Sequence, residues 1–191
     1  MDGIQRLNCS MRKKKSLVLE STSKLALRIL TQADVNLRYL SWLKDYEVTK
    51  YTEQSDKKQS LTKIESYVVE KLVSPNDFLF GIFFCGEHVG NIKIGPIKWE
   101  HLCCDVSYFI GDQNLWGRGV ATESIQLAIK FAFNDLKLEK IRAGYYSTNI
   151  ASGAVLSKCG FIVEGVLREA VIFEGRRIDA IEVGLLKRDF V

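Results

Sequence analysis

Histidine and paired cysteine are scarce in this 191-residue chain. It has two histidines, His88 and His101, and its five cysteines form no Cys-x-x-Cys pair. Two isolated imidazoles are too few for a histidine-rich metal site or an obvious serine–histidine–aspartate triad. An odd number of cysteines without framework spacing also argues against disulfides and zinc, so we expect no metal and a reducing compartment.

Long apolar runs are absent as well. No stretch approaches the roughly 18 residues that a membrane-spanning helix needs, and residues 1–15 are polar, with a basic run at 12–15. We expect a cytoplasmic protein without a membrane partner, in which residues 1–15 form a mobile tail and residues 16–191 a single domain. The sequence leaves open whether Met11 is the true start and whether the protein is a monomer or a homodimer.

Charge of neither sign is in large excess. The hydrophobic content of 47% is sufficient for one sizeable core. The net charge of +4 is far from the profile of a dedicated nucleic-acid-binding protein, so we expect no nucleic-acid partner. A mildly basic surface does suit a small ligand that carries several negative charges.

Two familiar phosphate motifs are missing. The chain has no P-loop, and Gly117-Arg-Gly119 lacks the third glycine and the acidic partner of a dinucleotide fingerprint. What is present is Asn114-Leu-Trp-Gly117-Arg-Gly119, between an apolar run and a helical run. Glycines let backbone amides approach an anion, and the first turn of a helix adds free N–H groups and a positive dipole end. The pattern alone fits either a phosphate socket or a plain tight turn.

Hydrophobic periodicity predicts a mixed sheet with helices, an α/β (α+β) class. Thr31-x-x-Asp34 reads as the start of the first helix, a short extra turn follows at 45–51, and Gly165 marks a bulge in the penultimate strand. The order is β-α-α-β-β-β-α-β-α-β-β. We expect strands at 17–30, 78–85, 89–97, 103–110, 140–146, 161–173 and 176–186, and helices at 31–44, 62–74, 120–136 and 150–159.

Several linked motifs occur in a fixed order along the chain: Asp105–Gly111, Leu115–Glu123, Asn149–Ser152, Lys158–Phe161 and Glu164–Arg168. With them, the region from about residue 25 to 189 resembles the GNAT family of acetyl-CoA-dependent N-acetyltransferases, and most closely its RimJ/RimL-like branch. The resemblance implies the GNAT (acyl-CoA N-acyltransferase) fold, a central, mostly antiparallel twisted sheet in which a splayed strand pair binds coenzyme A. It also implies an acyltransferase that uses acetyl-CoA as acetyl donor and an amine as acceptor.

The family's coenzyme loop, Gln/Arg-x-x-Gly-x-Gly/Ala, maps onto Asn114–Gly119 and departs from the pattern at Asn114. The resemblance implies that the pyrophosphate rests on this loop and that the strand before it pairs with the pantetheine arm. Asn149 matches a position that contacts the same arm, and it fits a helix cap equally well. The residues assigned to the coenzyme in this way are Phe109, Ile110, Asn114, Leu115, Trp116, Gly117, Arg118, Gly119, Val120, Ala121, Thr122, Asn149 and Lys158.

Acetyl transfer needs an amine that has lost its proton and a stabilised leaving thiolate. Asp105 matches an acidic residue of RimJ/RimL-like sequences and is the candidate base, although it could also bind the substrate ammonium or serve a structural hydrogen bond. The tyrosine that many GNAT enzymes use as acid is replaced by Leu156. Ser152 matches a serine that the branch places near the thioester sulfur, so it is the candidate donor, or simply a first-turn helix serine.

The acceptor is less well defined. Tyr145 and Tyr146 point to opposite faces of a strand end, and the pattern does not choose between them, although we take Tyr146 as the candidate. A glutamate of RimL-like enzymes is replaced by Val171, which favours a small amine (amino sugar, sugar nucleotide or polyamine), attacked directly in a ternary complex. The alternatives are a protein N-terminus, such as that of a ribosomal protein, and a catalytically weak acetyl-CoA-binding module. The candidate substrate-binding residues are Trp42, Tyr46, Glu53, His88, Asn91 and Tyr146.

Overall fold

The computed structural model describes residue 14 and residues 16–20, 24–53 and 58–190. Of the predicted tail at 1–15, only Lys14 is among them, so that prediction otherwise lies outside the described residues. Within the described residues, eight strands form one sheet in the order β1-β2-β3-β4-β5-β6-β8-β7. The strands are β1 (Val18–Glu20), β2 (Leu25–Ile29), β3 (Phe78–Phe84), β4 (Glu87–Lys98), β5 (Cys103–Ile110), β6 (Lys140–Tyr146), β7 (Ile162–Phe173) and β8 (Arg176–Leu186).

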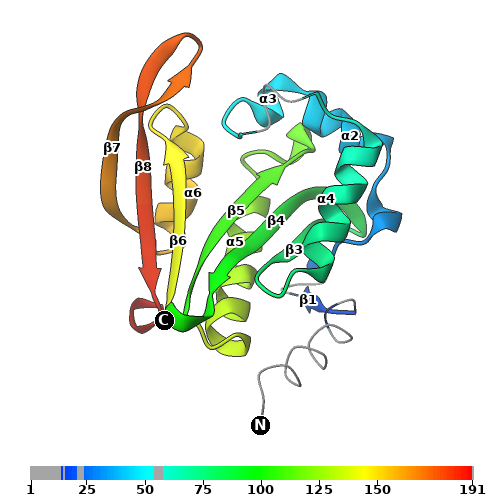
Figure 1. Cartoon of the computed structure of the whole chain (residues 1–191), viewed down its shortest axis with the longest axis horizontal. Helices are drawn as coiled ribbons and strands as arrows, with labels where there is room; N and C mark the ends of the chain where they lie inside the picture. Colours follow the sequence, from blue (N-terminus) through cyan, green and yellow to red (C-terminus); the bar gives the residue numbers. More distant parts are fainter. Residues whose placement is uncertain (1–13, 15, 21–23, 54–57, 191) are drawn as a thin grey trace.

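Helices cover both faces of the sheet (Figure 1). On one face, α5 packs its apolar stripe, Ile125, Ala128 and Ile129, against the buried side chains of β2 to β6. On the other face, α2 and α4 bury Trp42 and Ile64 in a smaller second cluster. The helices are α2 (Leu37–Lys44), α3 (Tyr46–Thr49), α4 (Leu61–Val73), α5 (Val120–Lys130) and α6 (Ile150–Lys158).

The start of the first helix differs from the prediction. Asp34 accepts hydrogen bonds from the Thr31 backbone N–H at 2.8 Å, and it forms an ion pair with Arg28 at 2.6 Å. These contacts close a short 3-10 turn, Gln32–Asp34, and the helix proper begins later, where the Asn36 side chain accepts from the Tyr39 N–H. The prediction that the first helix begins at Thr31 was therefore wrong, because the same side-chain pattern can cap a single turn as well as a helix.

The central feature is the junction of β5 and β6, the parallel pair in an otherwise antiparallel sheet. These strands pair only at their first residues, with Asp105 opposite Arg142 as the last matched position. Beyond that point β5 stays paired with β4 and β6 stays paired with β8, so the sheet opens between them. This splayed pair, which Figure 1 shows near its centre, confirms the predicted fold.

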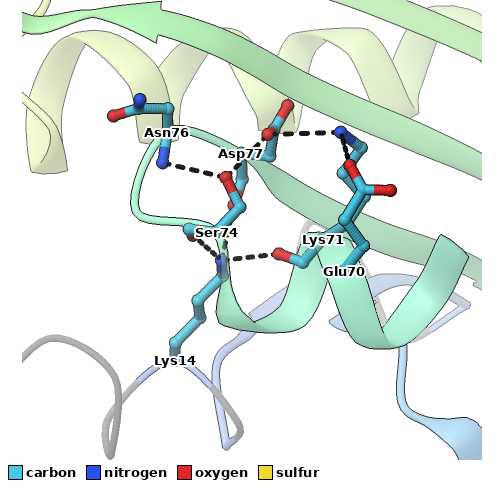
Figure 2. Close-up of polar contacts among 6 residues, drawn as sticks. All are labelled: Lys14, Glu70, Lys71, Ser74, Asn76 and Asp77. Atoms are coloured by element: carbon cyan, nitrogen blue, oxygen red, sulfur yellow. Dashed lines mark hydrogen bonds and ion pairs between the residues drawn. The ribbon is translucent and has the colours of Figure 1, made fainter. Parts of the chain in front are cut away.

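Lys14 ties the N-terminal side of the chain to the end of α4. Its side chain is buried, and Nζ donates to the backbone carbonyls of Lys71, Ser74 and Asp77 at 2.9, 2.8 and 2.5 Å (Figure 2). A helix C-terminus exposes unpaired carbonyls and a negative dipole end, so an ammonium there is stabilising. Burial nevertheless lowers the pKa of Lys14 to about 8, with the Asp77 carboxylate opposing the decrease.

Candidate active site

One large cavity occupies the gap between β5 and β6. Its volume is about 1530 Å³, and residues 106–110 of β5 and 143–146 of β6 form its two central walls. Since these segments no longer pair with each other, the inward backbone groups of β5 are open to a ligand. An extended chain could therefore lie between the strands and pair with β5 as a further strand would.

The glycine loop closes one end of this cavity. Gly117 and Gly119 adopt positive φ values of 73° and 82°, and a Cβ added to either would meet no atom within 4 Å. Trp116 anchors the loop, because its Nε1 donates to the Ile110 carbonyl at 2.9 Å. Gly119 is the N-cap of α5, so the free N–H groups of the first turn border the cavity, an arrangement that suits an anion.

The residues predicted for the coenzyme lie together around this end. Asn114 and Arg118 belong to the loop but do not line the cavity, and the Asn114 side chain is hydrogen-bonded to Asp112 at 3.1 Å. The others line it: Phe109, Ile110, Leu115, Trp116, Gly117, Gly119, Val120, Ala121, Thr122, Asn149 and Lys158. Lys158, at the end of α6, brings a positive charge to the same end of the cavity.

Two hydroxyl groups meet beside the splayed strands. Ser152 Oγ and Tyr108 Oη lie 3.1 Å apart, and both residues line the cavity. The Asn149 side chain accepts from the Ser152 N–H at 3.1 Å, which holds the first turn of α6 in place. Burial raises the pKa of Tyr108, and the Ser152 hydrogen bond opposes that increase. Sequence reasoning did not identify Tyr108, although its position in the motif after Asp105 was visible.

Asp105, the candidate base from the sequence, lies outside the cavity. Arg142 donates from Nε to Asp105 Oδ1 at 2.9 Å, and its Nη2 lies 2.7 Å from the same oxygen. Both side chains are 40% exposed, and Asp105 is not among the residues that line the cavity. The structure therefore brings the candidate base together with an arginine at the point where β5 and β6 separate, rather than with Ser152.

The acceptor side of the cavity is assembled from distant segments. Tyr146 Oη donates to Glu53 Oε1 at 2.9 Å, and both residues line the cavity; Tyr145 also lines it, with its ring packed over Gly153. At the tip of the β7–β8 hairpin, Phe173 stacks on Tyr51 with ring centroids 5.0 Å apart. Tyr46, from α3, donates to Glu174 of the same tip at 2.9 Å. We call these contacts of Tyr46 and Tyr51 with the tip the hairpin bridge.

Three other predicted substrate-binding positions form a packed wall. Trp42 fills the space beside Gly111, where an added Cβ would come within 2.1 Å of its ring. His88 packs edge-on against Trp42, burial lowers the pKa of the imidazole, and Nε2 lies 2.8 Å from Asn91 Oδ1. Asn91 lines the cavity. Trp42, His88 and Tyr46 do not, so they support the cavity wall or its entrance.

The described part of the chain holds no group of three or more histidine, cysteine, aspartate or glutamate side chains arranged for a metal ion. Nor does it contain a helix that is both long and apolar enough to cross a membrane.

The chain was compared with known proteins. A family model described as "Acetyltransferase (GNAT) domain" matches residues 24–162. An uncharacterized N-acetyltransferase, p20, from Bacillus licheniformis is 32% identical over 177 residues, which cover 88% of this chain and 96% of p20.

Solved structures of two acetyltransferases share the fold of this chain. RimL, the ribosomal L7/L12 alpha-N-protein acetyltransferase, in complex with coenzyme A, superposes with a TM-score of 0.82 at 17% identity, covering 89% of this chain and 98% of RimL. Spermidine N-acetyltransferase from Vibrio cholerae, in complex with CoA and spermine, superposes with a TM-score of 0.78 at 23% identity, covering 88% and 98% of the two chains. The splayed strands, the glycine loop and the family match agree, and the chain belongs to the GNAT family of acetyl-CoA-dependent N-acetyltransferases.

Proposed function

We propose that this protein transfers the acetyl group of acetyl-CoA directly to the primary amine of a small molecule. The observation that carries the proposal is the continuous cavity that runs from the glycine loop, past Tyr108 and Ser152, to Glu53 and Tyr146. A donor and an acceptor can therefore be bound together. The bound thioester supplies an activated acetyl group, so no covalent enzyme intermediate is required.

The donor end fits a molecule with a pyrophosphate and an extended amide-containing arm. The backbone amides of Gly117 and Gly119 and the first turn of α5 bind the pyrophosphate, and Lys158 adds a cation. The inward edge of β5 at residues 106–110 pairs with the arm. Asn149, which already caps α6, keeps this wall rigid.

Tyr108 and Ser152 stabilise the leaving sulfur. A thiol has an ordinary pKa of about 8.5, whereas that of tyrosine is about 10 and here is raised further. Complete proton transfer from Tyr108 to the thiolate would therefore be unfavourable. Instead, the two hydroxyls form a hydrogen-bonded pair in which Ser152 donates to the sulfur while Tyr108 supports it, which stabilises charge that develops during the reaction.

Glu53 is the carboxylate that we assign to the acceptor ammonium. Its Oε1 accepts from Tyr146 on the cavity wall, so it can bind the ammonium and take its proton, or pass it to water. Asp105, the candidate from the sequence, is already bound by Arg142 outside the cavity, and we assign it the positioning of the strand junction.

The hairpin bridge favours a small acceptor. It joins residues 46–51 to residues 173–174 across the acceptor side, which narrows the entrance for a folded protein that presents its N-terminus. One of the two superposed enzymes is a ribosomal-protein acetyltransferase and the other is a spermidine acetyltransferase. Similarity in fold alone therefore does not identify the acceptor. A polyamine is disfavoured by the lysines of the acceptor side, which are considered below.

The test is release of coenzyme A thiol with a panel of amines. Ser152→Ala and Tyr108→Phe should each lower kcat by about 10- to 100-fold, with the KM for acetyl-CoA nearly unchanged, because both act on the leaving group. Ser66→Ala, on the exposed side of α4, is the matched control. Tight acetyl-CoA binding without acetyl transfer to any amine would support the alternative of a binding module.

Variants of Glu53 and Asp105 test which of the two carboxylates is the base. Glu53→Gln should raise the acceptor KM by about 10-fold and lower kcat, whereas Asp105→Asn should act mainly on stability. If Asp105→Asn instead lowers kcat by about 100-fold with coenzyme affinity intact, and Glu53→Gln does not, the base is Asp105.

A further inference from the structure

The acceptor side of the cavity carries more positive than negative charge. The residues that line it there include four lysines, Lys50, Lys58, Lys63 and Lys93, and two glutamates, Glu47 and Glu53. Both glutamates already have partners: Lys50 Nζ lies 2.6 Å from Glu47 Oε2, and Glu53 accepts from Tyr146. Three lysines are thus left without a carboxylate in the described part of the chain.

Lys93 is the best placed of these three. It lies in the middle of β4, where strand alternation puts it on the same face as Asn91 and opposite Ser107 of β5. Its side chain is half-buried, and it forms no ion pair or hydrogen bond with any residue that the structure describes. A half-buried ammonium without an anion is unfavourable, so a cavity that holds one is suited to a ligand that brings the negative charge.

Asn91 adds an independent observation two residues away. It also lines the cavity, it is 3% exposed, and its Oδ1 is within hydrogen-bond distance of His88 Nε2. Its amide nitrogen Nδ2 is buried and forms no hydrogen bond of full geometry with a described residue, although it interacts with the nearby Tyr39 hydroxyl and so opposes the increase that burial causes in the Tyr39 pKa. Buried donors are almost always fully paired, so this weakly paired amide can donate to a ligand atom that accepts a hydrogen bond.

We propose that the acceptor amine also carries a phosphate group, which binds to Lys93 with the Asn91 amide as a second donor. This inference rests on the proposed function, because it specifies the substrate of the same cavity. Lys63 on α4, which donates only to the Lys58 carbonyl, adds charge on the facing wall. The amine then lies toward Glu53 and the phosphate toward β4, so the opposite charges of one small molecule meet opposite charges of the protein.

Matched acceptors test the charge preference. D-glucosamine 6-phosphate is compared with D-glucosamine, and 4-aminobutyrate with putrescine, which has the same chain length and the opposite charge at its far end. The expected result is a kcat/KM at least 10-fold higher for the phosphorylated sugar than for the neutral one. A preference confined to the second pair would assign the subsite to a carboxylate, and equal rates in both pairs would overturn the inference.

Variants of Lys93 link the preference to the residue. Lys93→Met should raise the KM for glucosamine 6-phosphate about 10-fold or more and leave the acetyl-CoA KM unchanged, and Lys93→Arg should retain the preference. Lys98→Met, at the exposed end of the same strand and outside the cavity, is the control. An unchanged preference in Lys93→Met would contradict the proposal.

A binding measurement separates this inference from the proposed function. Glucosamine 6-phosphate is titrated into protein saturated with coenzyme A, so that the glycine loop is already occupied, and the heat of binding is recorded. Binding that is lost in Lys93→Met, without acetyl transfer to any amine, would support the phosphate subsite and overturn the acetyltransferase assignment of this cavity. Acetylation of amines without binding of the phosphate group would support the acetyltransferase assignment and overturn the phosphate subsite.

Discussion

The coenzyme side and the acceptor side of the cavity differ in how far apart their residues lie in the chain. On the coenzyme side, contacts are local: Trp116 bonds to Ile110, six residues away, and Ser152 to Asn149, three residues away. On the acceptor side, Tyr46 bonds to Glu174 across 128 residues. The difference teaches that the donor half of this site consists of two segments that are each held by local contacts, the glycine loop and the start of α6, whereas the acceptor half is joined by contacts between segments far apart in the chain.

The largest effect is expected from a charge in the glycine loop. Gly119→Glu places a carboxylate where we propose that the pyrophosphate binds and should raise the KM for acetyl-CoA by about 100-fold or more, because like charges in a binding site cost several kcal/mol. Gly86→Glu is the matched control, since Gly86 has nearly the same φ, 81° against 82°, and an equally open Cβ position. Both variants should lose similar stability, of about 1–2 kcal/mol. An equal KM increase in both would remove the loop from coenzyme binding.

A smaller effect is expected on the acceptor side. Tyr51→Ala removes the ring that stacks on Phe173 and should raise the acceptor KM by about 3- to 10-fold, while the acetyl-CoA KM stays the same. Tyr51→Phe keeps the ring, loses only the 3.3 Å hydrogen bond to the Thr148 carbonyl, and should behave like the wild type. Steady-state kinetics with each substrate varied in turn measure both constants. An increase in the acetyl-CoA KM alone would mean that the two sides are not separate.

The smallest effect on catalysis is expected from Lys14, which supports α4 on the acceptor side and should act on stability instead. Its folded-state pKa of about 8 lies below the ordinary value, so between about pH 8 and 10.5 the unfolded chain holds a proton that the folded protein has released. Unfolding free energy should therefore rise with pH in that window relative to Lys14→Met, by up to about 3 kcal/mol. Denaturant unfolding of both proteins at pH 7, 8, 9 and 10 measures the difference. A difference independent of pH would contradict the lowered pKa.

Much of the sheet could be predicted because strand alternation is a local property. The strand at Cys103–Ile110 was predicted at its observed bounds, and the helix after Gly119 begins where predicted, although its α-helical part ends at Lys130 and a π-helical turn continues to Asp135. The first helix was not, because Asp34 serves an ion pair with Arg28 and closes a turn, and only the folded chain brings Arg28 close enough. Hydrogen-bonding side chains such as Thr31 and Asp34 can satisfy several local structures, so tertiary contacts decide between them.

The residues of the candidate site also fall into those that the sequence predicted and those that it did not. Most residues assigned to the coenzyme by resemblance line the cavity, but Asp105 does not, because Arg142 on a strand 37 residues away binds it. Tyr108 was overlooked for a related reason. Alternation puts it on the opposite face from Asp105, and only the packing of α6 shows that this face meets Ser152.

The sequence by itself determined the family, the glycine loop and the order along the chain of the strands around it, because glycine conformations and apolar periodicity depend on neighbours within a few residues. The tertiary structure decided which polar groups face the cavity. Glu53 meets Tyr146, and Lys93 lies beside Asn91 without a carboxylate, because the sheet opens after Asp105 and distant segments converge on the gap. Charge balance in a cavity depends on residues far apart in the chain, and folding alone brings them together.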